Sequence, residues 1–444
     1  PTGTRLSAGI LGDMMEEKQI IALRRRTFLA GLVGNIMEWY DFAVYGYFAP
    51  IIGRHFFPSN DPNTSLIAAF GVFAAGFLMR PIGGLVFGYI GDKIGRKAAL
   101  TASVITMAIP TFLIGVLPDY SQIGVTASVL LVILRMVQGV SVGGEYTTSV
   151  VFLVEAAEPN QRGFAGSWSA FGAVAGMVLG SALGALLTSL LSADAIHAWG
   201  WRVPFILGLG VGIAGLYIRE QIAEPIAIQK VPQATRSPIL EAFRSEWRAM
   251  LRIAGLNVLN AVSFYTVFVY LVTYLQQVVH ISSSEALSIN TLNMIVLLVL
   301  IPFAGALSDR WGRKPILFGS VVGVLLFSQP LFWAMHHPNV LLILFGQMGF
   351  AILLGLFLGV VPVTMVEAFP GHVRCSALSI SYNLCSGILG GTTPMVLTFL
   401  VERTHDDLSP AYYMMASALV SLVVILRLRE TFRDSLASEA PREI

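Results

Sequence analysis

Two stretches of this chain follow one pattern, Gly88-Tyr89-Ile90-Gly91-Asp92-Lys93-Ile94-Gly95-Arg96-Lys97 and Gly305-Ala306-Leu307-Ser308-Asp309-Arg310-Trp311-Gly312-Arg313-Lys314. Both have the form G-x-x-[small]-D-[KR]-x-G-R-K, and the second begins 217 residues after the first. Each follows a long apolar run and precedes another. The glycine before the final basic pair permits a tight reversal that a residue with a Cβ would strain. The pattern therefore predicts two basic turns between hydrophobic helices, at equivalent places in two related halves.

The composition predicts a membrane protein with many spans. Of 444 residues, 55% are hydrophobic and 12% are charged, and the mean hydropathy is +0.73. Soluble domains contain about 25% charged residues, so this chain is too apolar for that class. The net charge of +2 does not indicate nucleic acid as a partner. Two cysteines and seven histidines form no disulfide framework and no metal-ligand pattern, so we expect no metal and no cofactor.

Apolar runs of sufficient length occur twelve times. A spanning helix needs about 20 predominantly apolar residues. The candidates lie at approximately 27–53, 66–90, 98–117, 125–155, 163–190, 203–219, 250–279, 286–307, 315–334, 340–366, 373–401 and 409–427.

Lys and Arg are concentrated in alternate connections between these runs. With the N-terminus in the cytoplasm, 23 of the 28 lie in cytoplasmic segments, three in outer loops and two within helices. This bias is typical of cytoplasmic loops. We therefore expect a multi-pass protein of the bacterial cytoplasmic (inner) membrane with both termini in the cytoplasm.

A polar break divides the helices into six and six. We expect a cytoplasmic N-terminal segment at 1–26, an N-terminal six-helix bundle at 27–219, a cytoplasmic linker at 220–249, a C-terminal six-helix bundle at 250–428 and a cytoplasmic C-terminal tail at 429–444. A second repeat supports related halves: Glu155 is followed seven residues later by Arg162, and Glu367 by Arg374. Halves of this kind usually hold a substrate between them at mid-membrane.

The repeated turns favour a charge latch. Asp92 and Asp309 would hold the cytoplasmic ends of neighbouring helices together in one conformation and release them in another, with Glu155/Arg162 and Glu367/Arg374 as partners. The simpler alternative is that Lys and Arg only direct insertion, but this would not require an aspartate and two glycines in the same order twice. The gating candidates are Asp92, Arg96, Glu155, Arg162, Asp309, Arg313, Glu367 and Arg374.

These turns resemble the signature of the major facilitator superfamily, and Arg135-Met136-Val137-Gln138-Gly139 resembles its RxxQG motif. Further stretches are similar to the metabolite:proton symporter family within it, and the match extends from about residue 28 to about residue 430. They are Gly34-Asn35-Ile36-Met37-Glu38-Trp39-Tyr40-Asp41-Phe42, Phe77-Leu78-Met79-Arg80-Pro81-Ile82-Gly83-Gly84, Gly143-Gly144-Glu145-Tyr146-Thr147 and Trp199-Gly200-Trp201-Arg202-Val203-Pro204-Phe205.

The resemblance implies an all-α membrane protein whose twelve transmembrane helices form two pseudo-symmetric six-helix bundles, the major facilitator fold. The family includes proton symporters for proline/betaine, α-ketoglutarate, citrate and shikimate, so it implies transport and no enzyme activity. Its osmosensory proline/betaine members carry a long C-terminal coiled coil that is not found here, and we do not expect osmotic sensing.

Two carboxylates lie within the first predicted helix. A charge at the bilayer centre costs at least about 2.5–3.5 kcal/mol, which makes such residues functional candidates. Glu38 and Asp41 are three residues apart and share one helix face. The pair is suited to carry a proton, with Asp41 the preferred carrier. The alternative is that both are permanently paired with Arg80 and Arg135 as structural links.

Arg80 and Arg135 are the two cations predicted within the membrane. One could bind a substrate carboxylate through two parallel hydrogen bonds, and the other could neutralise the helix carboxylates; the sequence leaves this division open. Glu145 could pair with Arg135 or bind the cationic group of a zwitterion. The proton-coupling candidates are Asp41, Glu38, Arg135 and Glu145.

The second half has no charge inside its predicted helices and offers neutral polar side chains. The ordinary role of such groups is interhelical hydrogen bonding, which contributes about 0.6 kcal/mol on average. We therefore expect proton coupling in the first half and shaping of the substrate site by the second. The substrate-binding candidates are Arg80, Arg135, Tyr40, Gln138, Tyr146, Asn260, Tyr265 and Asn383.

The sequence thus predicts a secondary active transporter that takes up a small carboxylate-bearing metabolite with a proton by alternating access. The substrate would be a di- or tricarboxylate, or a zwitterion such as proline or betaine. The alternative is a proton-driven exporter of a siderophore or drug, although the GPxxGG pattern of drug antiporters is absent. A channel and a membrane enzyme are less consistent with the repeat and the residues. We expect a monomer in a lipid bilayer, with the proton as coupling ion.

Overall fold

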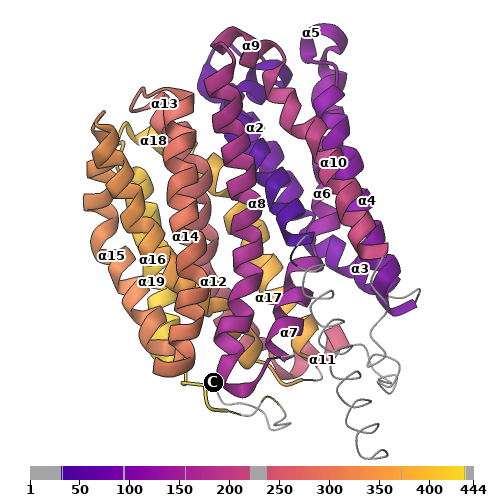
Figure 1. Ribbon diagram of the computed structural model, residues 1–444, viewed down its shortest axis with the longest axis vertical. Coiled ribbons are helices and arrows are strands. Elements are labelled where there is room, and N and C mark those ends of the chain that lie inside the picture. The colour runs from indigo at the N-terminus through magenta and orange to yellow at the C-terminus, as the bar shows by residue number, and fades with distance from the viewer. Residues whose placement is uncertain are drawn as a thin grey trace, which may run out of the picture.

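Long helices that run back and forth through the molecule form two groups, one from each half of the chain (Figure 1). A computed structural model describes residues 32, 34–93, 96–155, 157–220, 238–371, 373–434 and 436. In Figure 1 the indigo-to-magenta helices of the N-terminal half stand beside the orange-to-yellow helices of the C-terminal half. Side chains at 88–93, 96–100, 145, 152, 211, 218–220 and 238–241 lie outside this description.

The N-terminal half begins with a helix at 34–56. Two of its later spans are each built from two consecutive helices that meet at a short break. The elements are α2 (Pro62–Leu78) and α3 (Arg80–Lys93), α4 (Arg96–Val116), α5 (Tyr120–Ile123), α6 (Val125–Val142) and α7 (Glu145–Glu155), η1 (Pro159–Gln161), α8 (Arg162–Leu190), α9 (Ala193–Ala198), η2 (Gly200–Arg202) and α10 (Val203–Glu220).

The C-terminal half repeats this plan, and two of its spans contain a π-helical turn. Its elements are α11 (Pro238–Ser245), α12 (Trp247–Tyr265), η4 (Thr266–Tyr270), α13 (Leu271–Gln277), α14 (Ser283–Trp311), α15 (Arg313–His336), α16 (Val340–Glu367), α17 (Arg374–Cys385), η5 (Ser386–Gly390), α18 (Gly391–Thr404) and α19 (Ser409–Arg427).

The predicted all-α membrane fold is confirmed. Among the described residues, ten helical stretches are long and apolar enough to cross a membrane, and Thr101–Val116 is a shorter apolar helix. With the helix at 34–56, they make up the twelve predicted spans. Of the predicted linker, 221–237 lie outside the described residues, and the remainder contains α11 and the start of α12.

The second repeated turn has the geometry that its glycine predicts. Gly312 lies between α14 and α15 with φ at 95°, a conformation that residues with a Cβ rarely adopt. A Cβ at this position would also lie 2.6 Å from a carboxylate oxygen of Glu430. In the first turn, residues 94 and 95 are outside the description.

A row of glycines on α8 sets the position of the first helix. Gly172, Gly176 and Gly180 recur every four residues and face the helix at 34–56. Because glycines have no side chain, the backbones of the two helices can approach closely here. A Cβ on Gly176 would overlap the carbonyl oxygen of Ile36 and lie 2.9 Å from the amide nitrogen of Tyr40. The helix that carries both predicted carboxylates is therefore held directly against α8.

We expect Gly176→Ala to destabilise the protein by about 1–3 kcal/mol, since an added methyl group forces the two helices apart. Thermal unfolding of the detergent-purified protein measures this as a lower melting temperature. The matched control is Gly319→Ala on α15, where nothing lies within 4 Å of an added Cβ; its melting temperature should be unchanged or slightly higher. Equal melting temperatures for the two variants would contradict the close packing.

Candidate functional site

A small cavity lies between the two halves, beside Trp39. Its volume is about 20 Å³, which is room for about one water molecule. The lining residues are Trp39, Tyr146, Ala170, Ala173 and Val174 from the N-terminal half and Asn260, Ala261, Phe264, Tyr265, Leu358, Tyr382 and Ser386 from the C-terminal half.

Five aromatic side chains dominate this lining and connect the halves. The ring of Trp39 stacks on Tyr265 with centroids 6.2 Å apart and meets Phe264 edge-on at 5.7 Å. Tyr146 stacks on Tyr382 at 4.9 Å. Tyr265 directly precedes the π-helical turn η4, and η5 begins four residues after Tyr382. Such π-bulges occur frequently at functional sites.

Arg80 lies directly beside these rings and is paired with Glu38. Its Nη2 donates to Glu38 Oε1 at 3.1 Å, and both side chains are buried. The guanidinium carbon is 5.9 Å from the ring centroids of both Trp39 and Tyr382 and 5.0 Å from that of Phe77. Cations are attracted to aromatic faces at these distances. This ion pair therefore borders the cavity.

Asp41 forms a second ion pair one helical turn further on. Its Oδ2 accepts from Arg135 Nη1 at 2.8 Å, and its Oδ1 accepts from Thr111 Oγ1 at 2.8 Å and Gln138 Nε2 at 2.9 Å. The Arg135 guanidinium lies over the Tyr45 ring at 4.4 Å. None of these residues lines the cavity. The two arginines are thus divided between the two carboxylates.

The predicted substrate-binding residues fall into two groups. Tyr146, Asn260 and Tyr265 line the cavity, and Arg80 borders it. Others make contacts elsewhere: the Tyr40 hydroxyl donates to the Pro204 carbonyl, the Asn383 amide donates to the Gly143 carbonyl across the halves, and Arg135 and Gln138 bond to Asp41. The side chain of Glu145 lies outside the described residues.

Nine of the twelve lining residues were not predicted from the sequence, and four of these carry aromatic or polar side chains: Trp39, Phe264, Tyr382 and Ser386. Three of these four are direct sequence neighbours of residues that were predicted. Trp39 follows Glu38, Phe264 precedes Tyr265, and Tyr382 precedes Asn383. An aromatic residue directly beside a polar residue in a membrane helix could therefore have predicted these three lining residues.

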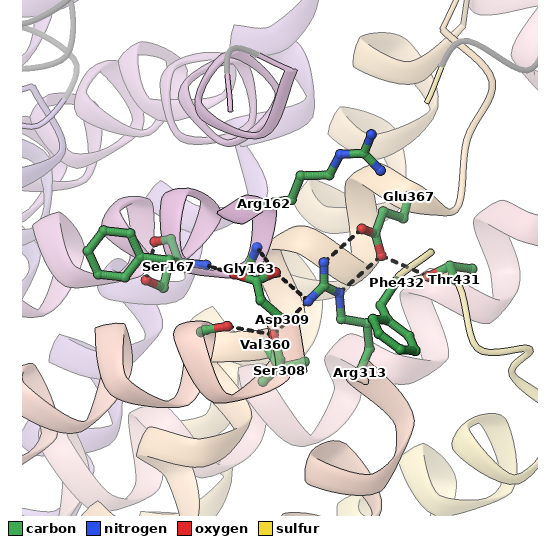
Figure 2. A network of polar contacts seen from close by, with 12 residues as sticks. Arg162, Gly163, Ser167, Ser308, Asp309, Arg313, Val360, Glu367, Thr431 and Phe432 are labelled. Carbon is green, nitrogen blue, oxygen red and sulfur yellow. Dashed lines mark hydrogen bonds and ion pairs between the residues drawn. The ribbon is translucent and has the colours of Figure 1, made fainter. Parts of the chain in front are cut away.

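A charge network closes the end of the molecule that carries the repeated turns, here called the inner end. The guanidinium of Arg313 lies between Asp309 and Glu367 (Figure 2). Its Nη1 donates to Asp309 Oδ1 at 2.8 Å, and its Nη2 donates to Glu367 Oε1 at 3.0 Å. All three side chains are at most 6% exposed, so the pairs are shielded from screening by water.

The same network joins the two halves. The Asp309 carboxylate accepts from the backbone N–H groups of Gly163 and Phe164 at 2.8 and 2.9 Å, at the start of α8. A carboxylate at a helix N-terminus is favourable because the unpaired N–H groups and the helix dipole point toward it. Arg374 pairs with Glu155 across the halves.

These contacts differ in detail from the predicted latch partners. Glu155 pairs with Arg374 of the other half and Glu367 with Arg313, whereas Arg162 donates to the backbone carbonyl of Asp434 at 2.8 Å. The side chains of Asp92 and Arg96, the equivalent positions in the first half, lie outside the described residues.

The segment after the last helix contributes to the inner end, which the sequence did not predict. The Glu430 carboxylate accepts from the backbone N–H groups of Arg313 and Lys314, both at 2.9 Å. Thr431 Oγ1 donates to Glu367 at 2.8 Å, a contact drawn in Figure 2. This segment therefore holds the start of α15 and the Glu367 carboxylate together.

Neutral groups close the opposite end, here called the outer end. Asn290 on α14 donates to the hydroxyls of Tyr47 at 3.0 Å and Ser181 at 3.3 Å, both in the N-terminal half. Gln347 donates to Asn290 Oδ1 at 2.7 Å and to the Val267 carbonyl of η4 at 3.1 Å. Contacts between the two halves are therefore present at both ends.

We expect Asp309→Asn to open the inner end about tenfold more often, because it weakens bonds to charged groups that contribute about 1.5–3 kcal/mol each. The readout is the rate at which a soluble maleimide alkylates Ser167→Cys, a fully buried position on α8, in a background without Cys375 and Cys385. The control Asp194→Asn removes an exposed carboxylate at the outer end. An unchanged alkylation rate in the Asp309 variant would exclude a gating role.

Comparison with known protein families supports this architecture. The family model "Sugar (and other) transporter" matches residues 27–224, and the model "Major Facilitator Superfamily" matches residues 253–443. Among solved structures, the proton:xylose symporter XylE bound to 6-bromo-6-deoxy-D-glucose superimposes with a TM-score of 0.75 at 16% identity, covering 94% of this chain and 98% of that one. The inward-open xylose transporter XylE from E. coli gives 0.69 at 19% identity, covering 92% and 97%.

Curated relatives are similar over almost the whole chain. The glycine betaine/proline/ectoine/pipecolic acid transporter OusA of Dickeya dadantii is 38% identical over 94% of this chain and 85% of its own length. The proline/betaine transporter of Escherichia coli K12 is 38% identical over 94% and 86%. A putative proline/betaine transporter of Staphylococcus aureus is 37% identical over 90% and 87%. The chain is therefore a membrane transporter, not an enzyme, and belongs to the major facilitator superfamily, in the metabolite:proton symporter family.

Proposed function

We propose that this protein imports a small zwitterion, of the proline or betaine class, together with a proton across the bacterial cytoplasmic membrane by alternating access. The observation that carries the proposal is the buried Arg80, whose guanidinium carbon lies 5.9 Å from the Trp39 and Tyr382 rings at an aromatic-lined cavity between the two halves. The curated relatives agree with it, since they are transporters of proline, betaine and similar compounds.

The chemistry of the cavity favours a zwitterion over a di- or tricarboxylate. Aromatic side chains arranged around a cavity are suited to quaternary ammonium groups, and an arginine is suited to a carboxylate. A di- or tricarboxylate would need more than one cation, and Arg135 is already engaged with Asp41, Gln138 and the rings around it. Asn260 and Ser386 add neutral hydrogen-bonding groups to the lining.

Asp41 is our proposed proton carrier. It lies on the same helix as Glu38, three residues on, so a proton and a substrate would bind at adjacent but separate places. Its partners come from other helices, Thr111 from α4 and Arg135 and Gln138 from α6. Protonation would weaken these charge-assisted bonds and allow the helix at 34–56 to shift relative to α4 and α6.

The two ends would open in turn. The inner end is held by charged pairs and the outer end by neutral hydrogen bonds. The free energy needed to open the inner end therefore differs from that needed to open the outer end. A ligand can only shift such an equilibrium by its difference in affinity for the two conformations. The bias of Lys and Arg toward the inner end supports a cytoplasmic location of both termini. We take a monomer as the transporting unit and a proton as its coupling ion.

Uptake into proteoliposomes tests the proposal. Purified protein should accumulate radiolabelled glycine betaine or proline when an inside-alkaline pH gradient is imposed, and a protonophore should abolish the accumulation. Citrate and α-ketoglutarate should neither accumulate nor compete at tenfold excess. Saturable uptake of citrate alone would contradict the substrate class. Transport driven only by the reversed gradient would instead support the exporter of the same fold.

A further inference from the structure

The Glu38–Arg80 ion pair borders the cavity, so both the negative charge of Glu38 and the positive charge of Arg80 would act on a bound substrate. The Arg80 guanidinium carbon is 5.9 Å from the ring centroids of Trp39 and Tyr382, which both line the cavity, and Arg80 is bonded to Glu38. Water has little access to this pair, since Glu38 and Arg80 are at most 3% exposed. In such surroundings an unbalanced charge is far more costly than in water.

We propose that Glu38 and Arg80 together form a dipole that selects net-neutral zwitterions. This rests on the proposed function and assigns its specificity. Arg80 binds the substrate carboxylate, and Glu38 supplies the negative charge opposite the substrate ammonium group among the aromatic rings. Glu38 is in this account a specificity residue, and the proton is carried elsewhere.

Arg80 has the donors that this role requires. Its Nη2 is used by Glu38, while Nε and Nη1 have no hydrogen-bond acceptor within the part of the chain that the structure describes. A guanidinium offers five N–H groups in a planar fork. Arg80 can therefore donate hydrogen bonds to a second carboxylate without releasing the first.

The charge balance then discriminates between three kinds of ligand. A zwitterion adds one positive and one negative group, so the filled site stays neutral. An anion of the same shape leaves the site with one net negative charge, and a cation leaves it with one net positive charge. Because neither excess charge is solvated among these buried side chains, both ligands are rejected.

Three ligands of nearly the same size test this on the wild-type protein. Glycine betaine is the zwitterion, 3,3-dimethylbutanoate replaces its nitrogen by carbon and is an anion, and choline lacks the carboxylate and is a cation. Calorimetric titration should show at least about tenfold weaker binding of both analogues than of betaine. Binding of all three within about twofold would overturn the proposal. Failure of betaine itself to bind would instead overturn the proposed function.

The variant Glu38→Gln should reverse the preference. It leaves Arg80 without its counter-charge, so 3,3-dimethylbutanoate should bind more tightly than in the wild type and glycine betaine more weakly. The ratio of their dissociation constants should change by at least about tenfold. The control Glu158→Gln removes an exposed carboxylate and should leave the ratio unchanged. A folded Glu38→Gln protein with the wild-type ratio would sink the proposal.

If Glu38→Gln does not fold, Glu38→Asp keeps the charge but withdraws it by one methylene group toward its own helix and away from Arg80. It should retain the rejection of choline and weaken betaine relative to 3,3-dimethylbutanoate. The three-ligand panel on the wild type does not depend on either variant. A wild type that distinguishes betaine from choline but not from 3,3-dimethylbutanoate would show that Arg80 reads the ligand without Glu38, and would contradict the dipole.

Discussion

Four charges buried in the N-terminal half have to neutralise one another, because the membrane interior offers them no water. Glu38, Asp41, Arg80 and Arg135 are each at most 3% exposed. Leaving any one of them unpaired would cost several kcal/mol. They form two separate ion pairs, in which two carboxylates of the helix at 34–56 bind one arginine each. The other side chains of the site surround one pair or the other. The pair nearer the cavity faces aromatic rings from both halves, and the other is enclosed by α4 and α6.

The division depends on how closely the helices approach. Gly172, Gly176 and Gly180 hold the helix at 34–56 against α8, which fixes the faces that its carboxylates present. Arg80 is the first residue of α3, directly after the break at Met79, and Gly143 allows α6 to pass close to the carbonyl oxygen of Arg80. The arginine is thus placed by backbone packing, and its side chain then reaches the cavity. Closure at the inner and outer ends completes the enclosure.

Much of this follows from the sequence, because hydropathy and charge position determine insertion into a membrane. The twelve spans, the two halves and the tight turn at Gly312 were predicted on these grounds. Glu38 and Asp41 were predicted to share a face, with ion pairing to Arg80 and Arg135 as an alternative. The structure realises that pairing, and our proposal gives both pairs a transport role.

What the sequence could not show depends on contacts between distant segments. Trp39, Phe264 and Tyr382 have the hydropathy of lipid-facing residues, so nothing in the apolar pattern separates them from the surface. The repeat predicted Glu155/Arg162 and Glu367/Arg374 as partners of the two aspartates, but a repeat does not reveal contacts between its copies, and Glu155 pairs with Arg374. Glu430 and Thr431 follow the last helix and resemble a solvated tail, although they bond to Arg313 and Glu367.

The central claim is that the two pairs have separate tasks, Glu38–Arg80 for the substrate and Asp41–Arg135 for the proton. Asp41→Asn tests it most directly, in proteoliposomes that are assayed both for gradient-driven accumulation and for exchange of labelled against unlabelled glycine betaine. We predict that exchange and the preference for betaine over 3,3-dimethylbutanoate persist while accumulation is lost. Retained accumulation against the gradient, or a changed ligand preference with accumulation intact, would contradict the account.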